Sequence, residues 1–402
     1  MERIRISRAT SSRLQVGMMV LATAMLLVLS CDKDTTGTIQ VNSTPTGAAI
    51  SLDGVSTGCA TNYSLANVAA GAHTVTLKLS GYEDFVQGVT VVAGQTSTIT
   101  ATLTQTHDYP SSLVETVPVG DGPFGVAVLP SGQYVYIANT YSDNVSVIRT
   151  SDNTVAATVP VGDGPACLAA LPNGNSVYVA NGSSGNISVI RTSDNTVVAT
   201  VPAGSYPYSV AASAASDYVY VTNIYSESVS VIRTSDNTVV ASVPVGSYPY
   251  GVTSLPNGDY VYVANHLSDN VSVIRTSDNT VVATIAVGQR PTCVTALPNG
   301  SYVYVTNASS DNVSVIRTSD NTVVSTVSVG DEPWFASSLP SSGYVYVTNS
   351  LSDNVSVIRT SDITVVATIS VGDQPINVAA SPDGSRVYIT NELSDNVSIL
   401  GY

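Results

Sequence analysis

Charged side chains are scarce in this chain of 402 residues, because Asp, Glu, Lys and Arg together make up only 11% of it. Acidic residues outnumber basic ones by 29 to 14, which leaves a formal net charge of -15. A surface with this excess of negative charge repels nucleic-acid phosphates and anionic lipid headgroups, so we expect neither as a partner. The simplest interpretation of the charge is solubility outside the cell.

Cysteine and histidine are also rare, with four and three copies. Cys31, Cys59, Cys167 and Cys293 form no Cys-x-x-Cys pair and no zinc-type spacing, so haem and structural zinc have no support. The sequence shows no pairing of a nucleophile with a base. We therefore expect no cofactor and no catalytic residue.

An apolar stretch, residues 16–29, follows four arginines within residues 1–15. It is short for a membrane span and has the layout of a signal-peptide core. It ends in Val28-Leu29-Ser30-Cys31, which resembles a bacterial lipobox. We predict a signal peptide over residues 1–30 and a tether, residues 31–35, that begins at a lipidated Cys31. The protein would then be exported, face the periplasm or the cell exterior, and meet the membrane only through its lipid. An ordinary secreted protein is the alternative.

The abundant residues favour strands and turns. Val, Thr and Tyr suit half-buried pleated surface, while Gly, Asn, Asp and Pro supply turns. Within residues 36–105, alternating stretches are separated by Gly-rich turns, as in a small β-sandwich. The segments Pro45-Thr46-Gly47-Ala48, Leu52-Asp53-Gly54 and Gly71-Ala72-His73 resemble the PEGA domain, with Thr46 in place of its Glu. That resemblance implies a spacer or adhesion module.

The strongest signal is internal repetition. A Tyr/Val-rich run ends in Asn at seven positions spaced by 42 residues: Asn139, Asn181, Asn223, Asn265, Asn307, Asn349 and Asn391. The first repeat reads as four strands, A to D: 124–129, 134–139, 144–149 and 154–160. Four antiparallel strands at this period describe one blade of a β-propeller.

Ring closure follows from the same alignment. The last repeat ends at Tyr402 after its strand C, and the segment 113–119 aligns with the strand D segment 155–161. We predict that this N-terminal strand completes the last blade, which leaves no open end in the ring. After a linker, residues 106–111, the chain would form a monomeric seven-bladed propeller over residues 112–402. The fold class is therefore all-β, a propeller preceded by a small β-sandwich.

Several repeats contain a Tyr-Val-Tyr-Val-Thr-Asn run, as at residues 218–223, 302–307 and 344–349. Over about 290 residues the chain resembles the YVTN family of β-propellers. The resemblance implies a surface-layer or secreted protein. Related folds include lactonases and lyases, so the fold alone fixes no activity.

Variation between blades concentrates in the D–A and B–C loops, which emerge on one face of a propeller. The candidate binding face comprises Phe124, Tyr206, Tyr208, Tyr248, Tyr250, His266, Arg290, Trp334 and Phe335. Tyr and Trp can stack on sugars or anchor a protein partner. The alternative is that these loops simply tolerate change.

Other recurring residues allow two interpretations each. Asp121, Asp163, Asp331 and Asp373 could bind calcium or cap turns. The repeated Arg149 is expected to form an ion pair, either across the C–D turn or between blades, rather than to bind an anion. The repeated Asn is expected to bond the backbone of its B–C turn. Cys167 and Cys293 share a repeat position three blades apart, which favours buried thiols over a disulfide.

The leading hypothesis is a non-enzymatic cell-surface lipoprotein that acts as a binding, adhesion or envelope-structural module. Its partner would be a surface glycan, an envelope polymer or a protein. The alternative is a lactonase-like hydrolase or a lyase acting at the channel mouth. A third hypothesis is a passive coat, with glycans on sequons such as Asn144 and Asn186.

Overall fold

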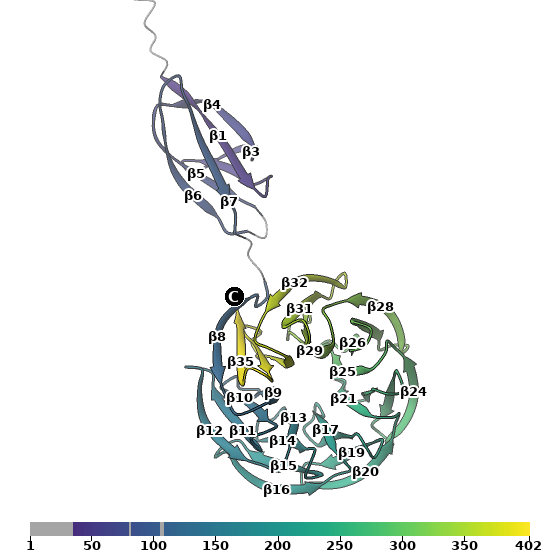
Figure 1. Cartoon of the computed structure of the whole chain (residues 1–402). Coiled ribbons are helices and arrows are strands. Elements are labelled where there is room, and N and C mark those ends of the chain that lie inside the picture. Colours follow the sequence, from purple (N-terminus) through teal and green to yellow (C-terminus); the bar gives the residue numbers. More distant parts are fainter. Residues whose placement is uncertain (1–34, 80–81, 105–107) are drawn as a thin grey trace, which may run out of the picture. The chain divides into compact units, whose positions relative to one another are not determined.

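The computed structural model describes residues 35–79, 82–104 and 108–402. Regular structure in these residues consists of strands (Figure 1). None of them belongs to a helix that is long and apolar enough to cross a membrane. The chain divides into two compact units, residues 1–107 and 108–402. The predicted signal peptide and Cys31 lie outside the described residues.

The N-terminal unit is built from two sheets that enclose one core. The first sheet has the order β4 (Tyr63–Ala69), β1 (Thr36–Thr44), β7 (Thr96–Thr102). The second has the order β3 (Val55–Ala60), β2 (Ala49–Leu52), β5 (Gly71–Lys78), β6 (Phe85–Val91). Alternate residues of β1 and β5, such as Ile39 and Leu77, are fully buried in this core. That period of two is the physical signature of a strand with one face inward.

The second unit is a ring of seven four-stranded antiparallel sheets (Figure 1). Blade 1 comprises β9 (Pro123–Val128), β10 (Tyr134–Asn139), β11 (Asn144–Arg149) and β12 (Thr154–Pro160). Blade 2 comprises β13 (Pro165–Ala170), β14 (Ser176–Asn181), β15 (Asn186–Arg191) and β16 (Thr196–Pro202), and blade 3 comprises β17 (Pro207–Ala212), β18 (Tyr218–Asn223), β19 (Ser228–Arg233) and β20 (Thr238–Pro244). Blade 4 comprises β21 (Pro249–Ser254), β22 (Tyr260–Asn265), β23 (Asn270–Arg275) and β24 (Thr280–Ala286), and blade 5 comprises β25 (Pro291–Ala296), β26 (Tyr302–Asn307), β27 (Asn312–Arg317) and β28 (Thr322–Ser328).

Blade 6 comprises β29 (Pro333–Ser338), β30 (Tyr344–Asn349), β31 (Asn354–Arg359) and β32 (Thr364–Ser370). Blade 7 takes β33 (Pro375–Ala380), β34 (Val387–Asn391) and β35 (Asn396–Gly401) from the C-terminus and β8 (Ser112–Pro118) from the start of the unit. β8 pairs antiparallel with β35, from Asn396 opposite Pro118 to Gly401 opposite Ser112. The predicted all-β propeller with its three-plus-one closure is confirmed. In Figure 1 the first strands of the blades surround the centre and the fourth strands form the rim.

Blades are held together by tyrosines buried between neighbouring sheets. The hydroxyl of Tyr136 donates to Asn195 Oδ1 of the next blade at 2.6 Å, and Tyr178 and Tyr262 make the same bond to Asn237 and Asn321. Burial raises the pKa of each of these phenols to about 12. A buried phenol needs such a partner, because an unpaired hydroxyl would keep its full desolvation cost.

In six of the seven blades the repeated Asn bonds an Asn side chain of strand C, which differs from the predicted bond to the backbone of its turn. Asn139 Nδ2 donates to the side chains of Asn144 (2.7 Å) and Ser146 (2.9 Å) on β11, rather than to the backbone of the turn. Gly120 is required beside it, because a Cβ there would lie 2.7 Å from Asn139 Nδ2. The side chain therefore ties strand B to strand C within the blade.

The predicted ion pair is confirmed in six blades, where it spans the C–D turn rather than joining two blades, as between Arg191 and Asp194. Hydrogen bonds from Arg191 and Thr196 lower the pKa of Asp194 to about 2. Both side chains are about half exposed, so solvent screens the pair and it contributes little to stability.

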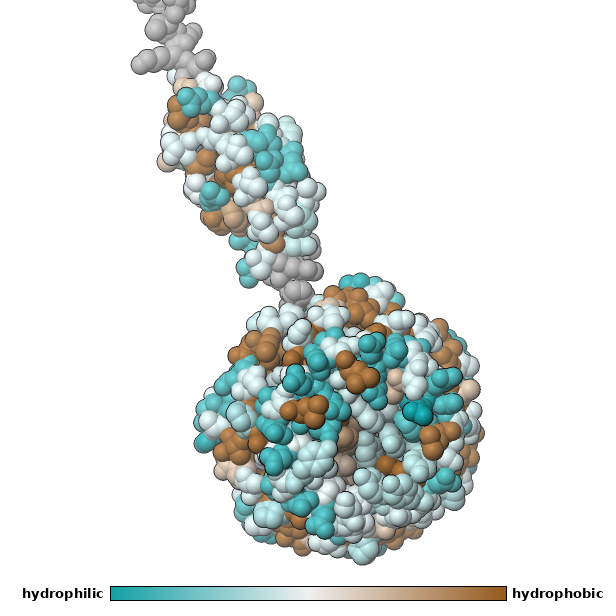
Figure 2. All heavy atoms as spheres, viewed as in Figure 1, coloured by the Kyte–Doolittle hydropathy of each residue, from teal (hydrophilic) through white to brown (hydrophobic). Residues whose placement is uncertain are grey.

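On the visible surface, apolar side chains are scattered among hydrophilic ones (Figure 2).

Candidate functional site

The D–A and B–C loops of each blade are bonded to each other at one end of the propeller. The backbone N–H of Thr140 donates to the carbonyl of Gly122 at 2.9 Å, and His266 donates to Tyr248 in the same way. In each blade, this bond joins the end of the D–A loop, just before strand A, to the start of the B–C loop, just after strand B. The loops with the most variable residues therefore share one surface, which we call the loop face.

Aromatic rings from four blades meet at the centre of the loop face. Phe124 lies edge-on to Phe335, with ring centres 6.2 Å apart, and to Tyr208 at 5.7 Å. Tyr208 in turn contacts Tyr250 at 4.7 Å. Since blades 1, 3, 4 and 6 supply these rings, they meet across the channel axis and fill its mouth. Only 8% of Tyr208 and 6% of Phe335 remain exposed, so these two stabilise the network from within.

Tyr250 lies at the junction of this network. Its ring stacks on His266 with centres 4.4 Å apart and on Trp334 at 6.0 Å. Burial lowers the pKa of His266, so its imidazole is neutral at pH 7. His266 Nδ1 is buried without a hydrogen-bond partner. Because this nitrogen is buried, it is out of reach of a ligand in this conformation.

A second aromatic cluster lies on the loop face, on blades 3 and 4. Tyr225 contacts Tyr206 at 5.1 Å and Tyr248 at 5.8 Å, measured between ring centres. Tyr206 is 36% exposed and Tyr225 60% exposed, while Tyr248 is half-buried. We call these three residues the tyrosine shelf. Arg290, at the equivalent loop position of blade 5, is exposed.

The channel beneath the rings contains a cavity of about 320 Å³ lined by residues of all seven blades. Cys167, Cys293 and Asn377 are among its lining residues. Both cysteines are free, which confirms the prediction of buried thiols. Burial raises the pKa of Cys293 to about 12 and raises that of Cys167 as well. A thiol that stays protonated is a poor nucleophile.

The four aspartates considered for calcium are exposed on the loop face. The backbone N–H of Asp121 donates to Ser142 Oγ at 2.7 Å, and Asp163, Asp331 and Asp373 repeat this bond to serines of their own blades. Within the described ranges, no three His, Cys, Asp or Glu side chains gather closely enough to hold a metal ion. The structure thus brings no acidic metal site together from these aspartates.

The sequence reasoning missed a set of exposed leucines on the loop face. Leu267, Leu351 and Leu393 occupy the second position after the repeated Asn and are 52–69% exposed. We call them the leucine rim. The repeat alignment could have revealed these leucines, because the same position holds Tyr225 in blade 3 and Tyr141 in blade 1.

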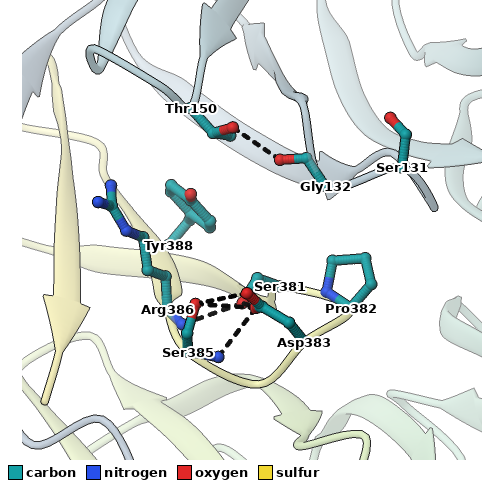
Figure 3. Close-up of a pocket in the computed structure, with 9 residues that line it drawn as sticks. All are labelled: Ser131, Gly132, Thr150, Ser381, Pro382, Asp383, Ser385, Arg386 and Tyr388. Atoms are coloured by element: carbon teal, nitrogen blue, oxygen red, sulfur yellow. Dashed lines mark hydrogen bonds between the residues drawn. The ribbon is translucent and has the colours of Figure 1, made fainter.

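A pocket at the seam between blades 7 and 1 was also missed (Figure 3). It measures about 370 Å³ and is lined by Ser131, Gly132, Thr150, Ser381, Pro382, Asp383, Ser385, Arg386 and Tyr388. Asp383 accepts hydrogen bonds from Ser381 and Ser385, which lower its pKa. The signal was Arg386, which replaces the Tyr or Ser found at this position in the other six repeats.

Comparisons with known proteins agree with this architecture. Residues 36–107 match the PEGA domain, and residues 246–336 match the lactonase, 7-bladed beta-propeller family. A solved structure of hydrazine synthase from Kuenenia stuttgartiensis is similar, with a TM-score of 0.65 and 22% identity over 74% of this chain and 97% of that one. At this identity the likeness shows the fold alone. No curated protein matches the chain.

Proposed function

We propose that this chain, which joins an N-terminal PEGA domain to repeated four-stranded units of the YVTN propeller type, is a non-enzymatic binding module of the cell surface. The loop face of the propeller would contact a glycan, an envelope polymer or a protein. Dense display on a surface would raise the avidity of contacts that are individually weak.

The observation that carries this proposal is the tyrosine shelf beside a mouth filled by packed rings. Tyr248 packs against the buried cluster that contains Tyr208, and Tyr225 contacts both Tyr248 and Tyr206, so a ligand that binds these rings loses little side-chain entropy. Tyrosine offers both an apolar ring face and a hydroxyl, which suits a surface that must stay soluble while free. Exposed apolar side chains clustered on one face are typical of interaction surfaces.

The rest of the molecule fits a role outside the cell. Export by the signal peptide and lipidation of Cys31 would attach the chain to a membrane, and the PEGA domain would act as a spacer. Mass spectrometry of the mature N-terminus tests the anchor. A diacylated or triacylated Cys31 supports it, whereas an unmodified cysteine or cleavage at another residue rules it out.

Binding of the mature protein to purified polysaccharides and to isolated cell envelopes tests the function. Tyr225→Ser and Leu351→Ser are suitable variants, because Ser occupies the same repeat position at Ser183 and Ser309. Loss of binding in either variant, with an unchanged melting temperature, supports a binding loop face. Binding that neither variant weakens would favour a passive coat instead.

A second candidate function is a lactonase-like hydrolase, favoured by the family match over residues 246–336. That segment contains Tyr250, His266 and Arg290, which lie at the mouth. A panel of sugar lactones and homoserine lactones tests it. Turnover that is abolished in His266→Ala would replace the binding proposal by this one.

A further inference from the structure

The D–A loops of blades 3 and 4 carry no charged residue in the two positions before the strand A proline. The two residues before the strand A proline carry carboxylates in blades 1, 2, 6 and 7, as at Asp121, Asp163, Asp331 and Asp373. In blades 3 and 4 the same two positions read Ser205-Tyr206 and Ser247-Tyr248. Tyr206 and Tyr248 of the tyrosine shelf therefore lie where the series of acidic D–A loops is interrupted.

The seams that carry these tyrosines have also lost a hydrogen bond that five other seams keep. At those five, an Asp side chain accepts the N–H of the residue before the proline in the next blade, as Asp143 does from Gly164 at 2.8 Å and Asp269 from Arg290 at 2.8 Å. Gly185 and Glu227 occupy the Asp position before Tyr206 and Tyr248. Gly185 has no side chain to accept, and for Glu227 the described structure contains no such bond.

The backbone at both tyrosines is in the left-handed region, with φ of 57° at Tyr206 and 54° at Tyr248. Blades 1 and 2 place Gly122 and Gly164 there, which adopt this conformation without steric cost. Tyr is disfavoured in it. The equivalent residues of blades 5, 6 and 7, which are Arg290, Glu332 and Gln374, adopt the same conformation, so it belongs to the repeat. The missing Asp hydrogen bond is what distinguishes the two seams that carry the tyrosines.

A second departure from the repeat, at Gly182, makes room for the ring of Tyr206. Gly182 is the only glycine at its position in the seven repeats. A Cβ on Gly182 would lie 3.3 Å from two ring carbons of Tyr206, so any other residue would press against the ring. Gly182 lets Tyr206 lie over the loop beside Tyr225.

The shelf geometry fits a sugar ring. Tyr225 is tilted by 49° to Tyr206 and by 78° to Tyr248, so the three rings form an open corner rather than a flat sheet. A pyranose presents a face of C–H groups that packs on such a ring, and equatorial hydroxyls that reach phenol oxygens at its edge. The carboxylates of the neighbouring blades repel anionic polymers. A neutral glycan meets no such penalty.

We infer that the tyrosine shelf is a subsite for a pyranose unit of a neutral glycan. This inference rests on the proposed function of the loop face and names its ligand class. Trp334 is the single tryptophan of the chain and stacks on Tyr250, so its fluorescence reports on the mouth. The probes are soluble hexasaccharides of glucose, mannose and N-acetylglucosamine, titrated into the mature protein.

We expect a saturable fluorescence change with at least one of the three hexasaccharides. Tyr206→Gly introduces the residue of blades 1 and 2, and Tyr225→Ser that of blades 2 and 5, so both variants should fold. Each should weaken binding about tenfold, which corresponds to about 1.4 kcal/mol for one lost ring contact. Val240→Ala is the matched control, because Val240 is exposed on strand β20 outside the loop face and Ala156 occupies its repeat position in blade 1; this variant should leave glycan affinity unchanged.

The remaining outcomes separate the inference from the function on which it rests. The absence of saturable binding to all three hexasaccharides by the folded protein overturns the glycan subsite. If isolated envelopes still bind and Leu351→Ser weakens that binding, the loop face docks a protein and the proposed function survives. If envelopes do not bind either, both proposals fail. Glycan binding that is equal in the shelf variants and the wild type also overturns the subsite.

Discussion

The hydroxyl of Tyr304 is buried against the neighbouring blade without a hydrogen-bond partner, and the residue packed near it in that blade is Ile363. Where Tyr136, Tyr178 and Tyr262 make this contact, the partner in the next blade is Asn. Ile363 also adopts a φ of 56°, the conformation of Asn195 and Asn237. One substitution in the repeat has therefore left both an unpaired hydroxyl and a β-branched residue in the left-handed region.

Replacing Ile363 by Asn should stabilise the propeller. Asn tolerates a positive φ, and its side-chain oxygen can accept from Tyr304 as in the other blades. A relieved left-handed conformation and one buried hydrogen bond together contribute about 2 kcal/mol to the free energy of unfolding. We expect the calorimetric melting temperature of Ile363→Asn to rise by a few degrees.

Two variants separate the contributions. Ile363→Gly relieves the backbone but supplies no acceptor, while Tyr304→Phe removes the unpaired hydroxyl and leaves the backbone as it is. Each of these two variants should raise the melting temperature of the propeller by less than Ile363→Asn does. A melting temperature that is unchanged or lower in Ile363→Asn would contradict this account of the seam.

The seam that closes the ring uses a different set of side chains. Arg386 Nη1 donates to Asn153 Oδ1 at 2.9 Å, and Asn153 Nδ2 donates to Glu115 on β8. Position 115 is Ala in five of the other blades. We predict that Glu115→Ala and Arg386→Tyr each lower the free energy of unfolding by about 1 kcal/mol. The double variant should lose less than the sum, because both side chains act through Asn153. If the two losses of unfolding free energy, measured by chemical denaturation, add exactly in the double variant, then the two side chains do not act through Asn153.

The fold could be predicted because the repeat keeps its 42-residue period without a slip. The period fixes the number of blades, and the alignment of residues 113–119 with a strand D fixes the closure. Side-chain partners were less predictable. Asn139 was expected to bond its turn, but its position on β10, opposite Asn144, directs it to strand C. That pairing depends on strand register, which the repeat alone does not show.

The candidate site was only partly accessible to sequence reasoning. The repeat shows which loops vary and which face they share. It does not show that Phe124 and Phe335 meet across the channel, because five repeats separate them in sequence. The positive φ at Tyr206 could have been suspected, since Gly occupies that position in blades 1 and 2.

The N-terminal domain should lose stability as the pH rises. His73 Nδ1 lies 2.7 Å from Asp53 Oδ2, and Nε2 lies 2.8 Å from the carbonyl of Ala69. Both ring nitrogens face acceptors, so the protonated form is favoured and the pKa of His73 is raised above 6.5. The stabilisation is complete below 6.5, the pKa of the unfolded chain, and is lost as the pH rises through the raised folded value. An NMR titration of His73 should give a midpoint above 6.5, and Asp53→Asn should lower it.

The propeller should respond to pH in the opposite direction through His266. Desolvation is the largest cause of its lowered pKa, and the nearby Arg290 guanidinium adds to it. The folded state therefore favours neutral imidazole, and its contribution to stability is complete above 6.5 and is lost as the pH falls from there through the lowered folded pKa. An NMR titration should place the midpoint of His266 below 6.5, and Arg290→Gln should raise it slightly. A midpoint at or above 6.5 would mean that the imidazole is hydrated rather than packed on Tyr250. The stacked arrangement at the mouth would then not hold in solution.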